Sequence, residues 1–138
     1  MIPRFHIAFP VHDIELCKTF YMKIIGCSLG RESDRWVDFN LHGHQVVAHL
    51  SPDDCSISKT NYVDGDNIPS RHFGVILARV KWEKLRTKIH DSGVQFLIEP
   101  KTRFKGHDAE QSTFFIQDPS GNILEFKSFK NKNAIFKK

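Results

Sequence analysis

Long apolar runs are absent from this sequence. The longest stretch without a polar side chain, Phe73 to Ala78, is far shorter than the roughly 18 residues that a membrane-spanning helix needs. Residues 1–6 show no apolar core and no small-residue cleavage site. We therefore expect a cytoplasmic protein with no membrane partner. Its 138 residues, 26% of them charged, are typical of one globular domain covering 1–138.

Cysteines are few, and their number is odd. Cys17, Cys27 and Cys55 form no CxxC pair. A disulfide scaffold is excluded on this pattern, and we expect reduced, buried or incidental thiols. Nothing near any of the three marks it as a nucleophile.

Several motifs of common enzyme classes are missing as well. The chain has no GxGxxG, no Walker-type Gly-Lys-Ser/Thr and no GxSxG, so nucleotide binding and serine hydrolysis have no support. The net charge of +4 comes largely from residues 127–138, which contain five lysines and no acidic residue. Because no nucleic-acid-binding motif accompanies this basic tail, we expect no nucleic-acid partner.

Hydrophobic periodicity predicts the elements of the first half. Residues 5–11 alternate as in a strand, and Asp13 is placed to cap a helix that ends at Gly26. Three further strands are predicted at 27–30, 35–41 and 45–50, with a turn at His42-Gly43-His44. Residues 52–69, rich in Pro, Asp and Gly, are predicted to form a connecting loop.

The same order of elements then begins again. A strand is predicted at 71–77, a helix at 82–91 that stops near Gly93, and strands at 94–98, 112–117 and 122–129. Asp118-Pro119-Ser120-Gly121 has the composition of a tight turn between the last two strands. The chain is thus interpreted as two modules of strand-helix-strand-strand-strand, at about 3–51 and 70–129, with a basic tail at 130–138.

Four side chains suited to metal binding hold matched places in the two modules. His6 and His72 occupy the first strands, 66 residues apart, while His49 and Glu125 occupy the last strands. Alternation puts all four on the faces opposite the large apolar residues. Imidazoles and a carboxylate are good ligands for a divalent transition metal, and two histidines with one carboxylate suit Fe(II). If the modules pair about a pseudo-twofold axis, the four residues converge in one cleft.

The sequence resembles the vicinal oxygen chelate superfamily, which includes glyoxalase I, type I extradiol dioxygenases and bleomycin resistance proteins. The resemblance covers about residues 5–129 and is closest to a group of predicted extradiol-type dioxygenases. Its most specific part is the closing turn followed by Asn122-Ile123-Leu124-Glu125-Phe126. The other segments that carry it are Phe5-His6-Ile7-Ala8, Gly43-His44-Gln45-Val46-Val47-Ala48-His49-Leu50, Glu110-Gln111 and Arg71-His72-Phe73-Gly74-Val75.

The resemblance implies an α+β fold in which paired βαβββ modules form a curved, eight-stranded mixed sheet around a cleft. It also implies a metal triad of His6, His72 and Glu125. His49 falls where glyoxalase I has a carboxylate or glutamine ligand, so it is either a fourth ligand or a catalytic acid/base beside the metal. We expect a small-molecule substrate, with Gln45, Arg103 and Gln111 as candidate substrate-binding residues.

Three functions follow from these expectations. The first is an extradiol-type dioxygenase that cleaves a catechol-like compound at Fe(II), which needs three open metal positions. The second is a glyoxalase-type lyase or isomerase with four protein ligands, for which Zn, Ni or Mn is possible. The third is a metal-free binding protein that sequesters a small molecule, although members of that kind lack the ligand set. Because symmetric dimers are the commonest oligomers, we also expect a homodimer.

Overall fold

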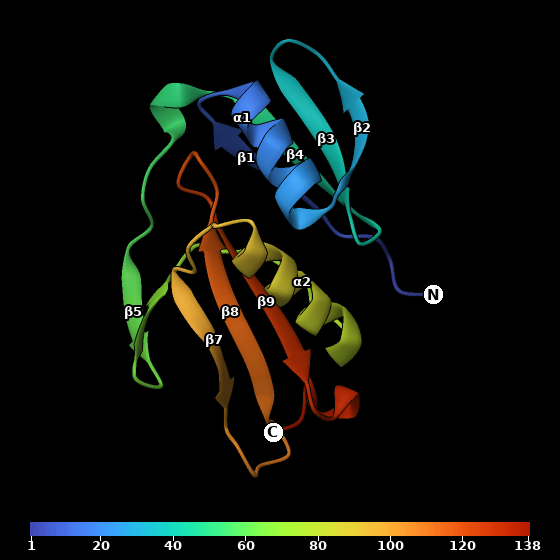
Figure 1. Cartoon of the computed structure of the whole chain (residues 1–138), viewed down its shortest axis with the longest axis vertical. Helices are drawn as coiled ribbons and strands as arrows, with labels where there is room; N and C mark the ends of the chain where they lie inside the picture. Colours follow the sequence, from blue (N-terminus) through green and yellow to red (C-terminus); the bar gives the residue numbers. More distant parts are fainter. The chain divides into compact units, whose positions relative to one another are not determined.

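The computed structural model describes all 138 residues and divides the chain into two compact units (Figure 1). Unit 1 comprises residues 1–57 together with 118–122. Unit 2 comprises residues 58–117 and 123–138. The tight turn at 118–122 belongs to unit 1 although it lies between two strands of unit 2.

Unit 1 is a four-stranded sheet of order β1-β4-β3-β2. β1 (His6–Val11) pairs in parallel with β4 (His44–Leu50), which pairs antiparallel with β3 (Trp36–Leu41). β2 (Ser28–Glu32) closes the outer edge through a bulged antiparallel ladder. The strands lie where alternation predicted them.

A helical segment covers one face of this sheet, as Figure 1 shows for α1. α1 (Ile14–Lys18) begins after Asp13, whose carboxylate accepts the Leu16 N–H at 2.8 Å, as expected of an N-cap. The chain continues as the π-helical segment η1 (Thr19–Ile25) and ends at Gly26, where φ is 92°. Tyr21 stacks on Phe39 beneath it, so the apolar face is buried by helical residues and the opposite face carries His6 and His49.

Unit 2 repeats this topology with one difference. β7 (Ile98–Arg103), β8 (Gln111–Gln117) and β9 (Ile123–Phe129) form an antiparallel sheet, and α2 (Arg79–Asp91) packs along it in Figure 1. The Trp82 indole N–H donates to the Phe126 carbonyl at 2.9 Å, which fixes α2 against β9. The predicted strand 71–77 pairs in parallel with β9 only at two isolated bridges, Phe73 with Leu124 and Ile76 with Lys127.

The predicted loop at 52–69 was wrong in its second half. A short 3-10 turn, η2 (Pro52–Asp54), is followed by a hairpin of β5 (Thr60–Val63) and β6 (Asp66–Pro69). Asp64 and Gly65 form its turn, with φ of 48° and 87°. Asp-Gly is a favoured two-residue hairpin turn because both positions need positive φ, so the composition taken for a loop marks a hairpin.

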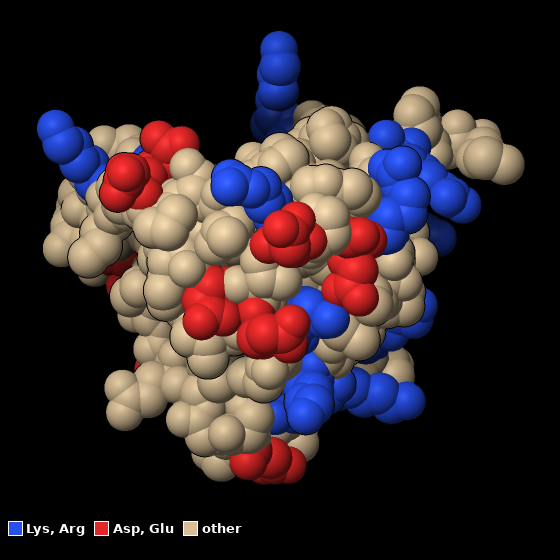
Figure 2. Space-filling view, turned by 90° about the horizontal axis from the view of Figure 1, so that it is seen from above, with Lys and Arg blue, Asp and Glu red and all other residues tan.

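The structure differs from the sequence prediction in two other places. The strand predicted at 94–98 begins only at Ile98, and the basic tail is partly packed. Ala134, in the 3-10 turn η3 (Lys132–Ala134), is only 2% exposed. No helix is long and apolar enough to cross a membrane. The face in Figure 2 carries both basic and acidic side chains.

The cysteines behave as expected of buried thiols. Cys17 and Cys27 are buried and Cys55 is partly so, and none of the three is in a disulfide. Burial, reinforced by the charge of Asp118, raises the pKa of the Cys17 thiol to about 12. At neutral pH Cys17 is therefore a packed thiol and not a nucleophile.

Candidate functional site

His72 and Glu125 meet on the face of the unit 2 sheet that points away from α2. His72 lies in the bridged segment beside β9, and its Nε2 is 3.4 Å from Oε1 of Glu125. The bridge at Phe73 sets this approach, because the Phe73 N–H donates to the Ile123 carbonyl and the Glu125 N–H donates to the Phe73 carbonyl. The ring of His72 also packs edge-on against Phe115.

Neighbouring groups hold both side chains in place. Nδ1 of His72 lies 2.7 Å from the Pro69 carbonyl, which only accepts hydrogen bonds, so this nitrogen carries a proton. The Thr113 hydroxyl donates to Oε2 of Glu125 at 2.6 Å, and the Lys127 ammonium is 3.4 Å from Oε1. Both residues therefore present a defined atom, Nε2 and Oε1, to the same space.

The electrostatics of the pair favour the charged carboxylate. Burial by itself would raise the pKa of Glu125, but hydrogen bonds from His72 and Thr113 and the charge of Lys127 lower it. The hydrogen bond to Glu125 raises the pKa of His72, against an opposing effect of burial. A cation placed here meets an anionic oxygen and a nitrogen ligand that must first lose its proton.

His6 is an exposed residue on the face of the unit 1 sheet opposite α1, and its strand neighbour holds it in place. In the β1–β4 ladder His6 pairs with Gln45, and its Nδ1 is 3.0 Å from the Gln45 side-chain oxygen. Nε2 of His6 is left for another partner. Beside it, unit 1 has a pocket of about 460 Å³ lined by residues that include Arg4, Asp38 and Asn40.

The strand registers show which residue of unit 1 corresponds to Glu125. In unit 2 the bridge at Phe73 joins Leu124, so Glu125 lies one residue beyond that pairing. In unit 1 the equivalent Ile7 pairs with Val46, and the next residue is Val47. His49 pairs with Pro10, four residues along β1 from His6, or roughly 13 Å at about 3.3 Å per residue. The position equivalent to Glu125 is thus held by an apolar side chain.

The three residues predicted to bind substrate all contact other protein groups in the structure. Arg103 is 7% exposed, and its guanidinium binds Asp66 at 2.7 Å and Asp64 at 3.1 Å. Gln111 is buried at the start of β8, with its amide donating to the Ala109 carbonyl at 3.4 Å. Gln45 contacts His6 and Asp38. Arg103 and Gln111 are therefore not part of the site that we propose below.

Sequence reasoning missed the residues that hold the candidate ligands. Asp38, Thr113 and the Pro69 carbonyl have no motif of their own. Asp38 and Thr113 do share the faces of His6 and Glu125 by strand alternation, but this shows only once the registers of β3 with β4 and of β8 with β9 are known.

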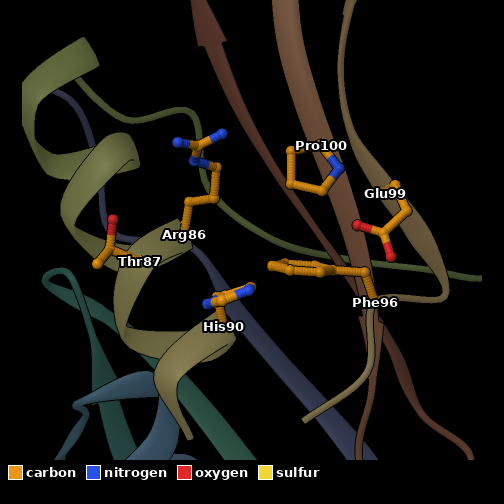
Figure 3. Close-up of a pocket in the computed structure, with 6 residues that line it drawn as sticks. All are labelled: Arg86, Thr87, His90, Phe96, Glu99 and Pro100. Atoms are coloured by element: carbon orange, nitrogen blue, oxygen red, sulfur yellow. The ribbon is translucent and has the colours of Figure 1, made fainter. Parts of the chain in front are cut away.

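A separate pocket of about 390 Å³ lies on the helix side of unit 2 (Figure 3). Arg86, Thr87 and His90 reach it from α2, opposite Phe96, Glu99 and Pro100. It is on the face of the sheet opposite to His72 and Glu125, and it has no group of metal ligands. We assign no role to it.

The donor set of unit 2 fits a divalent metal ion. With bonds of about 2.1 Å, two donors of one ion at angles of 90° to 109° stand about 3.0 to 3.4 Å apart. The distance between Nε2 of His72 and Oε1 of Glu125, 3.4 Å, agrees with this. Neither unit by itself gathers three or more His, Cys, Asp or Glu side chains into a metal-binding group.

Comparison with known proteins identifies the family. The model of the glyoxalase/bleomycin resistance protein/dioxygenase superfamily matches residues 5–126. A crystal structure of a glyoxalase/bleomycin resistance protein/dioxygenase from Alicyclobacillus acidocaldarius is 31% identical, with a TM-score of 0.83 over 97% of this chain and 96% of that one. The chain therefore belongs to this superfamily, and the predicted vicinal oxygen chelate fold is confirmed.

More distant structures share the fold alone. The fosfomycin resistance protein FosX from Listeria monocytogenes is 15% identical, with a TM-score of 0.68 over 98% of this chain and 100% of that one. A lactoylglutathione lyase from Agrobacterium tumefaciens is 14% identical, with a TM-score of 0.64 over 91% and 92% of the two chains. A comparison with curated proteins found no match. The description of the matching superfamily itself names glyoxalases, bleomycin resistance proteins and dioxygenases.

Proposed function

We propose that this protein is a divalent-metal-dependent enzyme acting on a small molecule, with His6, His72 and Glu125 as metal ligands. The observation that carries the proposal is the state of the two histidines. In each, Nδ1 lies within hydrogen-bond distance of an oxygen acceptor, so Nε2 is the ring nitrogen that can bind a metal. Metal-binding histidines typically donate their second ring nitrogen in this way.

Bound to these residues, a divalent ion would bind two neighbouring substrate oxygens and stabilise negative charge on them. The chain's own groups prepare the site for this. Thr113 holds one oxygen of Glu125 and leaves the other directed toward His72. Lys127 adds a positive charge next to the carboxylate, which supports binding of an anionic substrate oxygen.

Within this class we favour extradiol-type cleavage of a catechol-like compound at Fe(II). Two histidines and one carboxylate with open positions suit non-haem Fe(II) chemistry. Extradiol cleavage needs three open positions on an octahedral ion, and Val47 at the position equivalent to Glu125 supports a three-ligand set. His49, roughly 13 Å along β1 from His6 at about 3.3 Å per residue, is then outside the ligand set.

The first test is the metal content of protein purified anaerobically without an affinity tag, followed by oxygen uptake with a panel of catechols. About one iron per chain with oxygen uptake supports the proposal. Zinc or nickel, with glyoxalase turnover and no oxygen uptake, would favour the lyase or isomerase alternative. No metal even after reconstitution would contradict both and favour a sequestering protein.

The ligand assignment is tested by His72→Ala, with His90→Ala on the exposed surface of α2 as the matched control. We expect the first change to lower metal affinity at least about tenfold and the second to leave it unchanged. Circular dichroism checks that both variants fold. Unaltered metal content in folded His72→Ala protein would remove His72 from the site.

A further inference from the structure

We propose that Gln45 and Asp38 are positioning residues that fix His6 in the tautomer with the proton on Nδ1, so that Nε2 is presented as a ligand. The use made of Nε2 rests on the proposed metal-dependent function. The tautomer itself follows from unit 1 alone. The constraint passes from Asp38, through the Gln45 amide, to the imidazole.

Asp38 determines which way the side-chain amide of Gln45 is oriented. It lies on β3 and is only 6% exposed. Its Oδ2 receives the Gln45 amide nitrogen at 3.3 Å and the Arg31 guanidinium at 3.2 and 3.3 Å. An ionised carboxylate only accepts hydrogen bonds, so the Gln45 side chain must turn its NH2 group toward Asp38.

The Gln45 amide passes this constraint on. With its NH2 group bound to Asp38, its oxygen faces His6, and Oε1 lies 3.0 Å from Nδ1. The strand register makes the arrangement stable, since Gln45 pairs with His6 on one side and with Asn40 on the other. Asp38 is two residues from Asn40 and therefore on the same face of the sheet.

The imidazole is the last group to be fixed. An amide oxygen only accepts, so Nδ1 of His6 must carry the proton, and the neutral ring then has its lone pair on Nε2. In His72, too, Nδ1 donates to an oxygen acceptor, here the Pro69 carbonyl. The two units share no acceptor residue, and Nε2 of His72 lies 3.4 Å from Oε1 of Glu125.

The chemistry explains why these residue types are needed. A glutamine can accept from His6 and donate to Asp38 at once. A glutamate at position 45 would set two carboxylates against each other, and a leucine would supply neither bond. With asparagine at position 38, the Gln45 amide can turn over and donate to Nδ1, which moves the proton to Nε2 and removes the ligand lone pair.

The test is the tautomer of His6 in metal-free protein, read from long-range ¹H–¹⁵N correlations of the neutral imidazole ring. We expect the Nδ1–H form in the wild type. Asp38→Asn and Gln45→Leu should convert His6 to a mixture or to the Nε2–H form. The signals of His72 are the internal control and should not move.

Arg31→Ala is the matched control variant, because it removes a partner of Asp38 and leaves the bonds from Asp38 through Gln45 to His6 intact. We expect it to keep the wild-type tautomer. A second measurement, titration with Zn²⁺, should show about 10- to 100-fold weaker binding in Asp38→Asn and Gln45→Leu.

The outcomes separate the two proposals. Wild-type His6 in the Nε2–H form, or an unchanged His6 tautomer in folded Asp38→Asn and Gln45→Leu, overturns the positioning role. Wild-type protein that shows the Nδ1–H form and binds no metal supports the tautomer assignment and contradicts the proposed function. Loss of zinc affinity with no change of tautomer would mean that these residues act on the fold and not through His6.

Discussion

At the scale of single residues, the proposed metal binding depends on which atom of each side chain is not already used in another hydrogen bond. His6 and His72 each use Nδ1 for an acceptor, and Glu125 uses one oxygen for Thr113. Nε2 of His6 and Oε1 of Glu125 then have lone pairs for a metal ion, and Nε2 of His72 supplies one once it loses its proton. These three side chains differ from solvated polar residues on a sheet face, because they cannot rotate freely without breaking these hydrogen bonds.

Gly74 shows how closely the backbone must approach at this site. A Cβ at this position would stand 1.6 Å from the Glu125 carbonyl oxygen. We expect Gly74→Ala to lower the free energy of unfolding by about 3 kcal/mol or more, because a rigid backbone atom must move. It should also weaken metal binding by separating His72 from Glu125. Urea unfolding and metal titration check both effects.

Gly93→Ala is the control for this prediction. Gly93 has φ of 81° and open space where a Cβ would stand, so the change costs only left-handed strain of about 1 to 2 kcal/mol. Metal affinity should not change. Equal losses of stability in the two variants would contradict a role for close backbone approach at Gly74.

At the scale of elements, the β5–β6 hairpin is tied to β7 by charged groups. Asp66 Oδ2 accepts hydrogen bonds from the Lys101 ammonium and the Arg103 guanidinium, each at 2.7 Å. Asp64 in the turn binds the same guanidinium. Arg103, predicted as a substrate-binding residue, thus holds an element that the sequence did not predict.

We expect Asp66→Asn to cost about 2 kcal/mol at pH 7, since bonds to charged groups are lost and Arg103 keeps only Asp64. The Lys101 hydrogen bond lowers the pKa of Asp66, burial opposes this, and Arg103 lowers the pKa further. Because the folded pKa lies below the unfolded value of about 3.9, this stabilisation is present above that pH and is lost as the pH falls through the folded pKa.

Urea unfolding at pH 7 and at about pH 2.5 measures the effect. The difference between wild type and Asp66→Asn should shrink at the lower pH as the wild-type carboxylate takes up its proton. Asp53→Asn, at an exposed position in η2, should cost little at either pH. A difference that stays constant between the two pH values would show that the charge of Asp66 does not stabilise the hairpin.

At the scale of the whole molecule, the repeat proposed from the sequence is a repeat of topology. In each unit a first segment pairs in parallel with the last strand, and the middle strands complete an antiparallel sheet. One crossover helical segment follows each first segment. The same module topology is therefore present twice in a chain whose halves differ in sequence.

We predict that the protein is a homodimer, since symmetric pairs are the commonest assemblies and members of this superfamily often form dimers. Light scattering after gel filtration should give twice the chain mass of 16.0 kDa. A mass of one chain at micromolar concentration would contradict the prediction.

Most of the fold was determined by the sequence itself. The strands at β1, β3, β4, β8 and β9, the Asp13 cap, the stops at Gly26 and Gly93 and the closing turn at 118–121 were all predicted. These features depend on side-chain periodicity and on local backbone preferences, which adjacent residues fix by themselves. The faces of His6, His49 and Glu125 followed from the same alternation.

Only the tertiary structure shows which residues of neighbouring strands lie side by side, because this depends on the strand register. Alternation tells which face a residue occupies, but not which residue of the neighbouring strand lies beside it. For that reason the sequence could not show that Val47, and not His49, occupies the position equivalent to Glu125. It also could not show the contacts of Asp38 and Thr113. The ion pairs that join the β5–β6 hairpin to β7 were out of reach as well, since they join residues more than 30 positions apart.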